Sequence, residues 1–397
     1  MALPSAPSDT IEGSGFPLCF LCGPVDRRPE VLGLSDARDT FVIQARALGG
    51  HQKEAVVNEG HSGAAWRMVS DEGAGLKGTD LAPFPLGFMA AGLQADLLNR
   101  ISRRAEMRGI VLERVETGLI NQYRFDGSFF RGDGQGHAYS PRITLRIQSD
   151  ASAEHVKALV HEAVLASPIL AAWRTPLTNT FALYANGRRL SLDNLAASGA
   201  PDAVDPLKSW TGVPRPFQDT APAEAIIQKI GPAQLSQTGS PPVWQSGKVE
   251  IPIHGTAALS NRETNSRTWA NLPGGTCFAL RSDESDRRAL APSGLAYALS
   301  GVAFCLMTQI LRYVEHHKMN IRALRLVQST DCELSGGIAR AHPIDTHVFL
   351  HGDESVEVMK RLLQMAANTC YLHAALHSAL EPTIEIELNG TPIPSWT

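Results

Sequence analysis

Two cysteines raise the first chemical question. Cys305 lies in the apolar run GVAFCLMTQI, and Cys370 follows 65 residues later in NTCYLHAAL. A cysteine attacks as its thiolate, and a second thiol can trap an oxidised sulfur as a disulfide. The plainer interpretation is that each cysteine is a small core residue. The pair therefore predicts either thiol chemistry or simple packing.

An aspartate raises a second question. Asp96 lies inside the apolar stretch PFPLGFMAAGLQADLLNRI (83–101), and the stretch PSGLAYALSGVAFCLMTQI (292–310) has Cys305 at the matching place, 209 residues later. Both stretches predict long buried helices. An ionised aspartate inside a helix core is costly unless a base pairs with it. Three interpretations follow: Asp96 pairs with Lys53, Arg100 or Arg262 in an inactive site, it lines a substrate pocket, or it is an acid/base group whose pKa is tuned by burial.

The two stretches belong to a longer internal repeat. Six blocks of sequence recur in the same order, at offsets between 203 and 212 residues. Besides the helix and the residues leading into it, the matched blocks are 51–55 with 260–264, 65–73 with 277–285, 149–173 with 352–376, and 180–187 with 383–390. This period is too long for a solenoid unit, so it predicts a duplicated domain.

Each copy predicts the same order of elements. Alternating runs such as FVIQARAL (41–48) and KVEIPIHG (248–255) indicate strands. The apolar helix follows, then a pair of strands, then a second helix that begins after Ser152 or Ser355 as N-cap, then a last strand. This order is typical of an α+β fold rather than of βαβ winding.

The predicted boundaries follow from the repeat. We assign residues 1–35 to an N-terminal extension, 36–192 to domain 1, 193–240 to a linker, and 241–397 to domain 2. The linker is rich in Pro, Ala, Ser and Gly. Its Trp210 and the apolar run AIIQKI predict that part of it packs against the protein.

The second copy resembles the OsmC/Ohr family, the osmotically induced and organic-hydroperoxide-resistance proteins. The family helix has the form N-P-E-x-L-x-A-A-x-x-x-A-C, and GLAYALSGVAFC (294–305) aligns its cysteine with Cys305. The family's second cysteine begins a C-P-V-like run, which Cys370 fits. In the first copy, PLGFMAAGLQAD (85–96) ends in Asp96, and ASPIL keeps the proline but has Ser167 in place of the second cysteine.

The resemblance implies a fold. Family members are intertwined two-fold dimers, with curved antiparallel sheets around long central helices. Two copies in one chain would then form a pseudo-dimer within a single polypeptide. The active sites of such a fold lie near the boundary between subunits, so each site could draw residues from both copies.

The resemblance also implies site residues. The family holds its thiolate with an arginine about forty residues upstream, and Arg262 precedes Cys305 by 43 residues; the equivalent in the first copy is Lys53. The family's glutamate, which orients that arginine, falls on Leu295 here. Glu263 or a residue of the other copy must then take its place. We expect substrate to contact three positions: Lys53, Leu295 and Ser167.

Several functions remain open at this stage. The first is a thiol peroxidase for organic hydroperoxides, in which Cys305 attacks, Cys370 resolves, and Arg262 or Lys53 holds the thiolate. The second is a repurposed hydrolase or lyase for a small, largely apolar compound, with Asp96 or Cys305 in its site. The third is a binding protein without chemistry. For the peroxidase we expect an external dithiol reductant, and for every case no metal or cofactor.

Composition narrows the class of partner. The formal net charge of −4 gives no reason to expect nucleic acid or a membrane surface. Six cysteines and no basic cluster ahead of an apolar leader predict a cytoplasmic protein. The pair Cys19 and Cys22 lacks a second pair at zinc spacing, so we expect a packed apolar segment. The four arginines of NRISRRAEMR (99–108) predict a solvated helix end.

Overall fold

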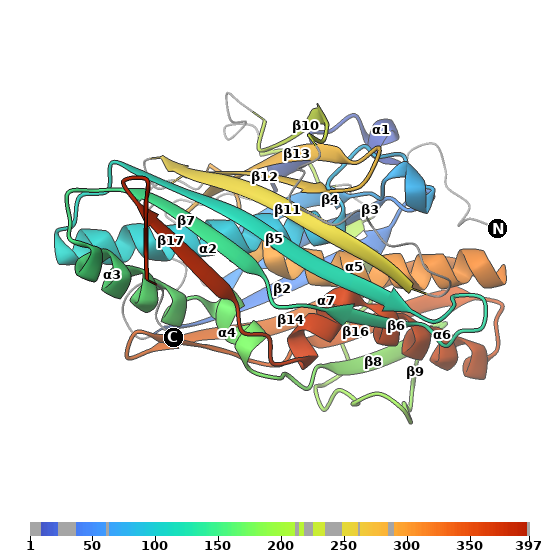
Figure 1. The fold of residues 1–397 in the computed structure, drawn as a ribbon. Helices are drawn as coiled ribbons and strands as arrows, with labels where there is room; N and C mark the ends of the chain where they lie inside the picture. The colour runs from blue at the N-terminus through green and yellow to red at the C-terminus, as the bar shows by residue number, and fades with distance from the viewer. Residues whose placement is uncertain are drawn as a thin grey trace.

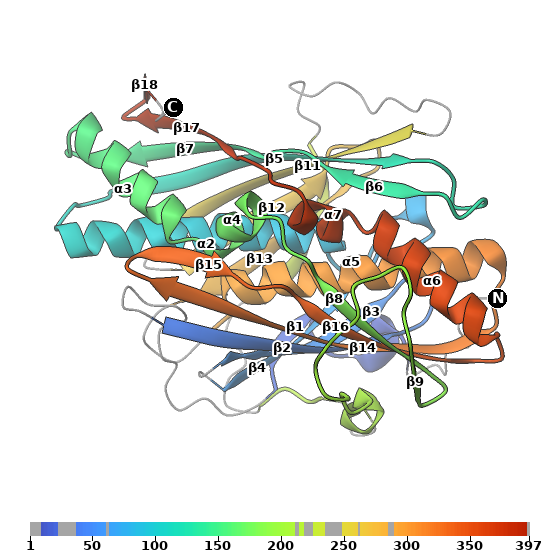
Figure 2. The ribbon, with the colours of Figure 1, turned by 90° about the horizontal axis from the view of Figure 1, so that it is seen from below.

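Helices α2 (Pro85–Arg108) and α5 (Gly294–His317) lie side by side between two β-sheets (Figure 1, Figure 2). The computed structural model describes residues 9–22, 37–60, 63–210, 214–217, 225–234, 248–260, 263–284 and 290–394. Pro85 occupies the first turn of α2, where its missing N–H is not needed. Ser293 caps α5 by accepting a hydrogen bond from the backbone N–H of Ala296.

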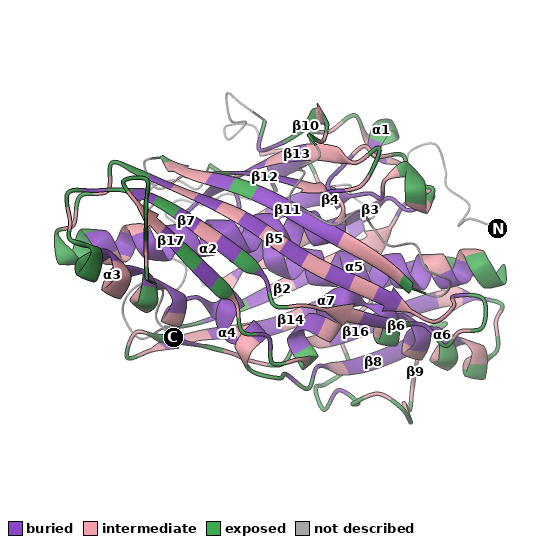
Figure 3. Cartoon of the chain, viewed as in Figure 1, coloured by how far each residue is buried: buried purple, intermediate pink, exposed green. Residues whose placement is uncertain are grey.

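Both helices are buried over most of their length (Figure 3). A helix that is covered on both sides needs apolar or small residues all round, which explains their long apolar runs. By length and composition α5 could cross a membrane, but its whole apolar window is buried inside the protein. The apolar character of α5 therefore fits a core helix.

Sheet A takes its strands from both halves of the chain. Its order is β1 (Cys19–Leu21), β4 (Ala64–Ser70), β3 (Lys53–Glu59), β2 (Ala37–Ala47), β14 (Ile321–Ser335), β16 (Asp345–Gly352), β8 (Thr180–Ala185) and β9 (Arg188–Leu190), with β15 (Ile338–Ala341) paired to β14. The two halves meet at the antiparallel pair β2–β14, where Phe41 lies opposite Thr330.

Sheet B repeats this arrangement with the halves exchanged. Its order is β10 (Ile227–Pro232), β13 (Thr276–Asp283), β12 (Glu263–Ala270), β11 (Lys248–Ser260), β5 (Arg114–Asp126), β7 (Arg142–Gln148), β17 (Thr383–Leu388) and β18 (Thr391–Ile393), with β6 (Gln135–Ala138) paired to β5. The halves meet at β11–β5, where Ile253 lies opposite Asn121. The second half thus repeats the order of elements of the first.

The expectation of antiparallel sheets is wrong for one pair in each sheet. β8 runs parallel to β16, and β17 runs parallel to β7. The last long strand of each half pairs with a strand of the other half. β8 of the first half joins sheet A beside β16, and β17 of the second half joins sheet B beside β7. The helices that carry each of these strands across set its direction, so both sheets are mixed and the fold is α+β.

A bent pair of helices makes each crossing. The pairs are α3 (Ala153–Leu165) with α4 (Pro168–Arg174), and α6 (Val356–Thr369) with α7 (Tyr371–His377). Ser152 and Ser355 cap the first helix of each pair, as the sequence predicts. The remaining short helices are α1 (Ile11–Ser14), η2 (Ala74–Leu76) and η3 (Pro206–Trp210).

Glycines let α2 and α5 approach closely at the centre of the molecule. A Cβ added at Gly92 would lie 2.5 Å from the carbonyl oxygen of Gly294 and 2.6 Å from the backbone nitrogen of Ala298. A Cβ at Gly301, the repeat partner of Gly92, would lie 2.9 Å from the carbonyl oxygen of Pro85. The helices can pack backbone against backbone only because these positions lack side chains.

Segments outside the repeat complete the sheet edges. β1, from the N-terminal extension, pairs with β4, and β10, from the linker region, pairs with β13. Trp210 is buried beneath the Arg46 guanidinium, which lies 5.2 Å from the centre of its ring. Parts of both connecting segments therefore belong to the folded body.

Candidate functional site

Cys305 and Cys370 come together in the second half. Cys305 lies midway along α5 and is 2% exposed, while Cys370 is the fully buried residue that precedes α7. Their side chains are neighbours, close enough for Cys305 to raise the pKa of Cys370. The fold thus brings two thiols that are 65 residues apart in sequence into direct contact.

The surroundings of Cys370 favour its protonated form. Burial is the main cause that raises its pKa well above the ordinary value, and the adjacent Cys305 raises it further. Backbone N–H groups of Leu372 and His373 act in the opposite direction. The Nδ1 atom of His373 lies 3.1 Å from the Cys370 sulfur.

The first half supplies a buried ion pair beside the same helix. Lys53 lies at the start of β3. Its Nζ donates hydrogen bonds to the backbone carbonyl of His51 at 2.6 Å and to Oε1 of Glu72 at 3.4 Å. The hydroxyl of Thr308 donates to that same Glu72 oxygen at 2.5 Å. Thr308 lies three residues after Cys305 and so shares its face of α5. The pair thereby connects the first half to the helix of Cys305.

Aromatic residues enclose the thiols from both halves. Tyr123 of β5 and Tyr371 of α7 pack with ring centres 5.8 Å apart. Burial raises the pKa of Tyr123, and the neighbouring Cys305 adds to the effect. Burial also raises the pKa of Tyr371 to about 12, with Arg312 acting in the opposite direction. Both phenols are neutral near pH 7, so the site has a largely apolar wall.

The first half has a different pair at the corresponding positions. Asp96 is fully buried in α2 and accepts from the Ser167 hydroxyl at 2.5 Å and from Nε of Arg100 at 3.1 Å. Ser167 is the N-cap of α4 and accepts from the backbone N–H of Leu170. Of the three bases considered for Asp96, Arg100 pairs with it and Lys53 pairs with Glu72, while Arg262 lies outside the described residues. The Asp96 carboxylate is thus compensated by the charge of Arg100 and by the hydrogen bond from Ser167.

The surroundings of the two pairs also correspond. Asn99, which matches Thr308 at the offset of 209 residues, donates to the carboxylate of Glu284, which aligns with Glu72. Cys332 of β14 lies near Asp96; burial raises the pKa of the Cys332 thiol, and the charge of Asp96 raises it further. One site carries a thiol pair, and the other carries a hydroxyl and carboxylate pair.

Residues 285–385 match the family described as OsmC-like protein. This part of the chain is an OsmC-like domain. Among solved structures, an OsmC-like hydroperoxide resistance protein from Jannaschia sp. CCS1 matches 36% of this chain and 95% of its own, at 22% identity and a TM-score of 0.24. No curated protein matches the chain.

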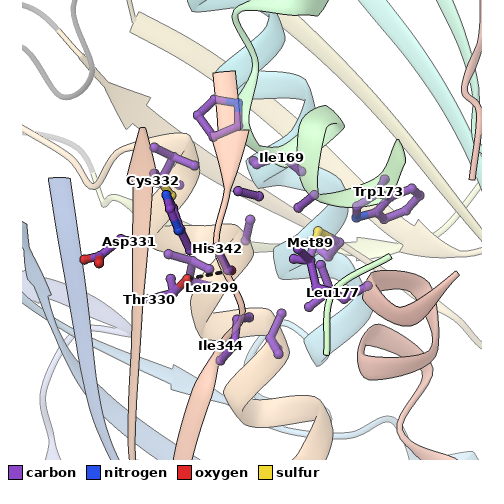
Figure 4. A pocket seen from close by; sticks show the side chains of 17 residues that line it. Met89, Ile169, Trp173, Leu177, Leu299, Thr330, Asp331, Cys332, His342 and Ile344 are labelled. Carbon is purple, nitrogen blue, oxygen red and sulfur yellow. Dashed lines mark hydrogen bonds between the residues drawn. The ribbon is translucent and has the colours of Figure 1, made fainter. Parts of the chain in front are cut away.

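The OsmC-like domain contains Cys305, Cys370 and Leu295, but Lys53 and Ser167 lie outside it. Leu295 lines a cavity whose walls include neither Cys305 nor Cys370. This cavity of about 30 Å³ lies on the Asp96 side, and Met89, Trp173 and Cys332 also line it (Figure 4). A space of this size has room for one or two water molecules. Arg262 lies outside the described residues.

Sequence reasoning missed four residues that stand beside the OsmC-like thiol pair or its helix: Glu72, Tyr123, Thr308 and His373. Tyr123 and Glu72 belong to the first half, and their position depends on strand pairing between halves that no local pattern reveals. Thr308 and His373 could have been found, because each follows a cysteine by three residues, about one helical turn.

The prediction of a solvated arginine face at the end of α2 is wrong for two residues. Arg100 and Arg103 are buried, and Arg103 donates to the carbonyl of Glu284 at 2.6 Å. The helix stays between the layers at this turn, so these side chains find partners inside the protein. Arg108, near the end, is exposed and pairs with Glu162.

The N-terminal cysteines fit the packing interpretation. Cys19 is buried in β1, and burial raises the pKa of its thiol well above the ordinary value. Burial also raises the pKa of Cys22 to about 12. Both are therefore protonated near pH 7 and poor nucleophiles. Within the described ranges, no three His, Cys, Asp or Glu side chains gather as a metal site would require.

Proposed function

We propose that the protein is a thiol-dependent peroxidase for organic hydroperoxides, with Cys305 as nucleophile and Cys370 as resolving cysteine. The observation that carries this proposal is that the two buried cysteine side chains lie next to each other. The OsmC-like domain around them supports it, as does the apolar wall of Tyr123 and Tyr371. A resolving thiol must reach the oxidised sulfur before over-oxidation does, and direct contact meets that need.

The reaction has two steps on the protein. The Cys305 thiolate attacks the terminal peroxide oxygen, the O–O bond breaks, and the alkoxide leaves as the alcohol after taking up a proton. Cys305 is then a sulfenic acid. The Cys370 sulfur attacks the Cys305 sulfur, an S–S bond replaces the S–O bond, and the hydroxyl leaves as water. An external dithiol then reduces the disulfide.

We further propose that the chain is an intramolecular pseudo-dimer of two OsmC-like units, divided near residues 192 and 241. The repeated order of elements supports this, and so does the exchange of β8 and β17 between sheets. In this arrangement Lys53, from the first unit, supplies the cation for the Cys305 thiolate of the second. Glu72 orients Lys53 and replaces the carboxylate that the Leu295 position lacks.

The test is consumption of cumene hydroperoxide in the presence of dithiothreitol. Cys305→Ser should abolish turnover. Without reductant, Cys370→Ser should consume one equivalent of hydroperoxide to form the Cys305 sulfenic acid and a second equivalent to form the sulfinic acid, with no disulfide. Lys53→Met should slow the first step. Cys332→Ser is the matched control, because this cysteine is equally buried but stands by Asp96, and it should retain activity. Unchanged turnover in Cys305→Ser, or none in the unaltered protein, would refute the proposal.

The hydrolase or lyase alternative would place the chemistry at Asp96. Its carboxylate is already engaged by Arg100 and Ser167, and the cavity nearby is too small for a substrate. These contacts favour a structural role for Asp96. Loss of a hydrolytic activity in Asp96→Asn that persists in Cys305→Ser would reverse this view.

A further inference from the structure

The resolving step of the proposed peroxidase needs a proton acceptor. Cys370 is fully buried, and its surroundings keep it as a thiol. A thiol is a weak nucleophile compared with its thiolate. A base beside the Cys370 sulfur would therefore speed disulfide formation.

His373 stands in the position of such a base. Its Nδ1 atom lies 3.1 Å from the Cys370 sulfur, one helical turn away on α7. The ring is 6% exposed and packs against Phe181, with ring centres 5.3 Å apart. Among the residues that the structure describes, none accepts from or donates to its Nε2 atom. Within the described part of the chain, the imidazole thus has the Cys370 sulfur as its polar partner.

The imidazole is neutral, so one ring nitrogen can accept the thiol hydrogen, and because burial disfavours the imidazolium, the ring holds that proton only transiently. Burial lowers the pKa of His373 to about 4, so the ring is neutral near pH 7. A neutral imidazole has one nitrogen without a proton, and the tautomer that leaves Nδ1 bare can accept the thiol hydrogen. Proton transfer within hydrogen-bond distance is the usual geometry of general base catalysis.

The first half of the chain provides an internal comparison. The repeat matches Cys370 with Ser167, and at the same offset of 203 residues it matches His373 with Leu170. Leu170 is fully buried in α4, so an apolar side chain can occupy this place in the fold. The histidine is present in the half with the thiol pair and absent from the half without it. Packing alone therefore does not require an imidazole here.

We propose that His373 is the general base of the resolving step. Its Nδ1 accepts the Cys370 proton as the Cys370 sulfur attacks the Cys305 sulfenic acid. The S–O bond breaks as the S–S bond forms, and the departing hydroxyl receives the proton from the imidazolium and leaves as water. This role rests on the proposed peroxidase function.

The test separates the two steps in a single turnover with one equivalent of cumene hydroperoxide. In His373→Leu, which copies the first half, sulfenic acid formation should stay within about twofold of the unaltered protein, while disulfide formation slows about 100-fold. His373→Gln can keep a hydrogen bond but cannot take the proton, and it should be equally slow. His377→Leu, at an exposed position of α7, is the matched control and should leave both steps unchanged.

Two outcomes would overturn the role of His373. One is disulfide formation at the normal rate in His373→Leu or His373→Gln. The other is an equal loss in both steps, which would indicate a damaged site.

The oxidant diamide gives an independent measurement, because it adds to one thiolate and the second thiol displaces a hydrazine to form the disulfide. If the unaltered protein does not react with hydroperoxide, the proposed peroxidase function is refuted. Slower diamide-driven disulfide formation in His373→Leu than in the unaltered protein would still support His373 as the base. An equal rate would refute it.

Discussion

The Ser167 hydroxyl donates to the Asp96 carboxylate at 2.5 Å, although the two residues are 71 positions apart in the chain. Cys370 and Cys305 share the corresponding contact in the second half. The same link between a central helix and the N-cap of the short helix beside it therefore exists twice, once with oxygen and once with sulfur. The oxygen version cannot form a disulfide, but it still holds the helices together.

Removal of the Asp96 charge should destabilise the protein. Asp96→Ala removes the carboxylate that pairs with the buried Arg100 guanidinium, which we expect to lower the free energy of unfolding by about 3 kcal/mol. The double variant Asp96→Ala with Arg100→Leu should recover part of this loss. Urea unfolding curves measure both effects. Glu162→Ala, which breaks the exposed pair with Arg108, is the control and should cost less than about 1 kcal/mol.

A second thiol pair can be built from the first. The triple variant Asp96→Cys, Ser167→Cys and Arg100→Gln copies the residues at the matching positions of the second half, where Gln309 corresponds to Arg100. Because the two sites share a backbone arrangement, we expect diamide to form a disulfide between positions 96 and 167. Peptide mass spectrometry of the oxidised protein measures it. Finding only the Cys305–Cys370 disulfide would show that the two sites are not geometrically equivalent.

Gly92 should not tolerate even one added methyl group. In Gly92→Ala the new Cβ would meet backbone atoms of Gly294 and Ala298 at 2.5 and 2.6 Å, so α2 and α5 must move apart. We expect a loss of about 2 kcal/mol or more in the free energy of unfolding, despite the better helix propensity of alanine. Gly75→Ala is the control, because its added Cβ would meet nothing within 4 Å. Equal unfolding free energies for the two variants would contradict the close crossing.

His373 should make stability depend on pH. Its pKa is about 4 in the folded protein and about 6.5 when unfolded, so as the pH falls below 6.5 the unfolded chain takes up a proton that the folded protein cannot. Stability is therefore lost between about pH 6.5 and 4. Between pH 7.5 and 4.5 we expect the unaltered protein to lose roughly 2 to 3 kcal/mol more than His373→Leu. Urea unfolding at both pH values measures this, and parallel losses would argue against a buried neutral imidazole.

The helices and their caps could be predicted from the sequence. The apolar stretches 83–101 and 292–310 mark α2 and α5, although both helices continue for another two turns that are more polar. Local patterns suffice here, because a helix needs only its own residues to satisfy its backbone hydrogen bonds. The resemblance also predicts that Cys305 and Cys370 share a site, and the fold places their side chains next to each other.

The assignment of strands to sheets could not be predicted in this way. Lys53 and Glu72 reach the helix of Cys305 because β3 and β4 belong to the sheet that contains β14 and β16. This pairing joins residues almost 300 positions apart, and alternation along a strand does not identify its neighbour. For the same reason the parallel pairs β8–β16 and β7–β17 were unexpected.

The mixed origin of each sheet has a consequence for synthesis. The chain leaves the ribosome from its N-terminus, and β8 emerges long before β16, its partner in sheet A. β2 likewise waits for β14, and β5 waits for β11. Until the C-terminal half has been translated, the first half exposes apolar faces and open strand edges, which favours aggregation and slow folding. We expect this chain to depend on holding chaperones during translation more than a protein whose halves close their own sheets.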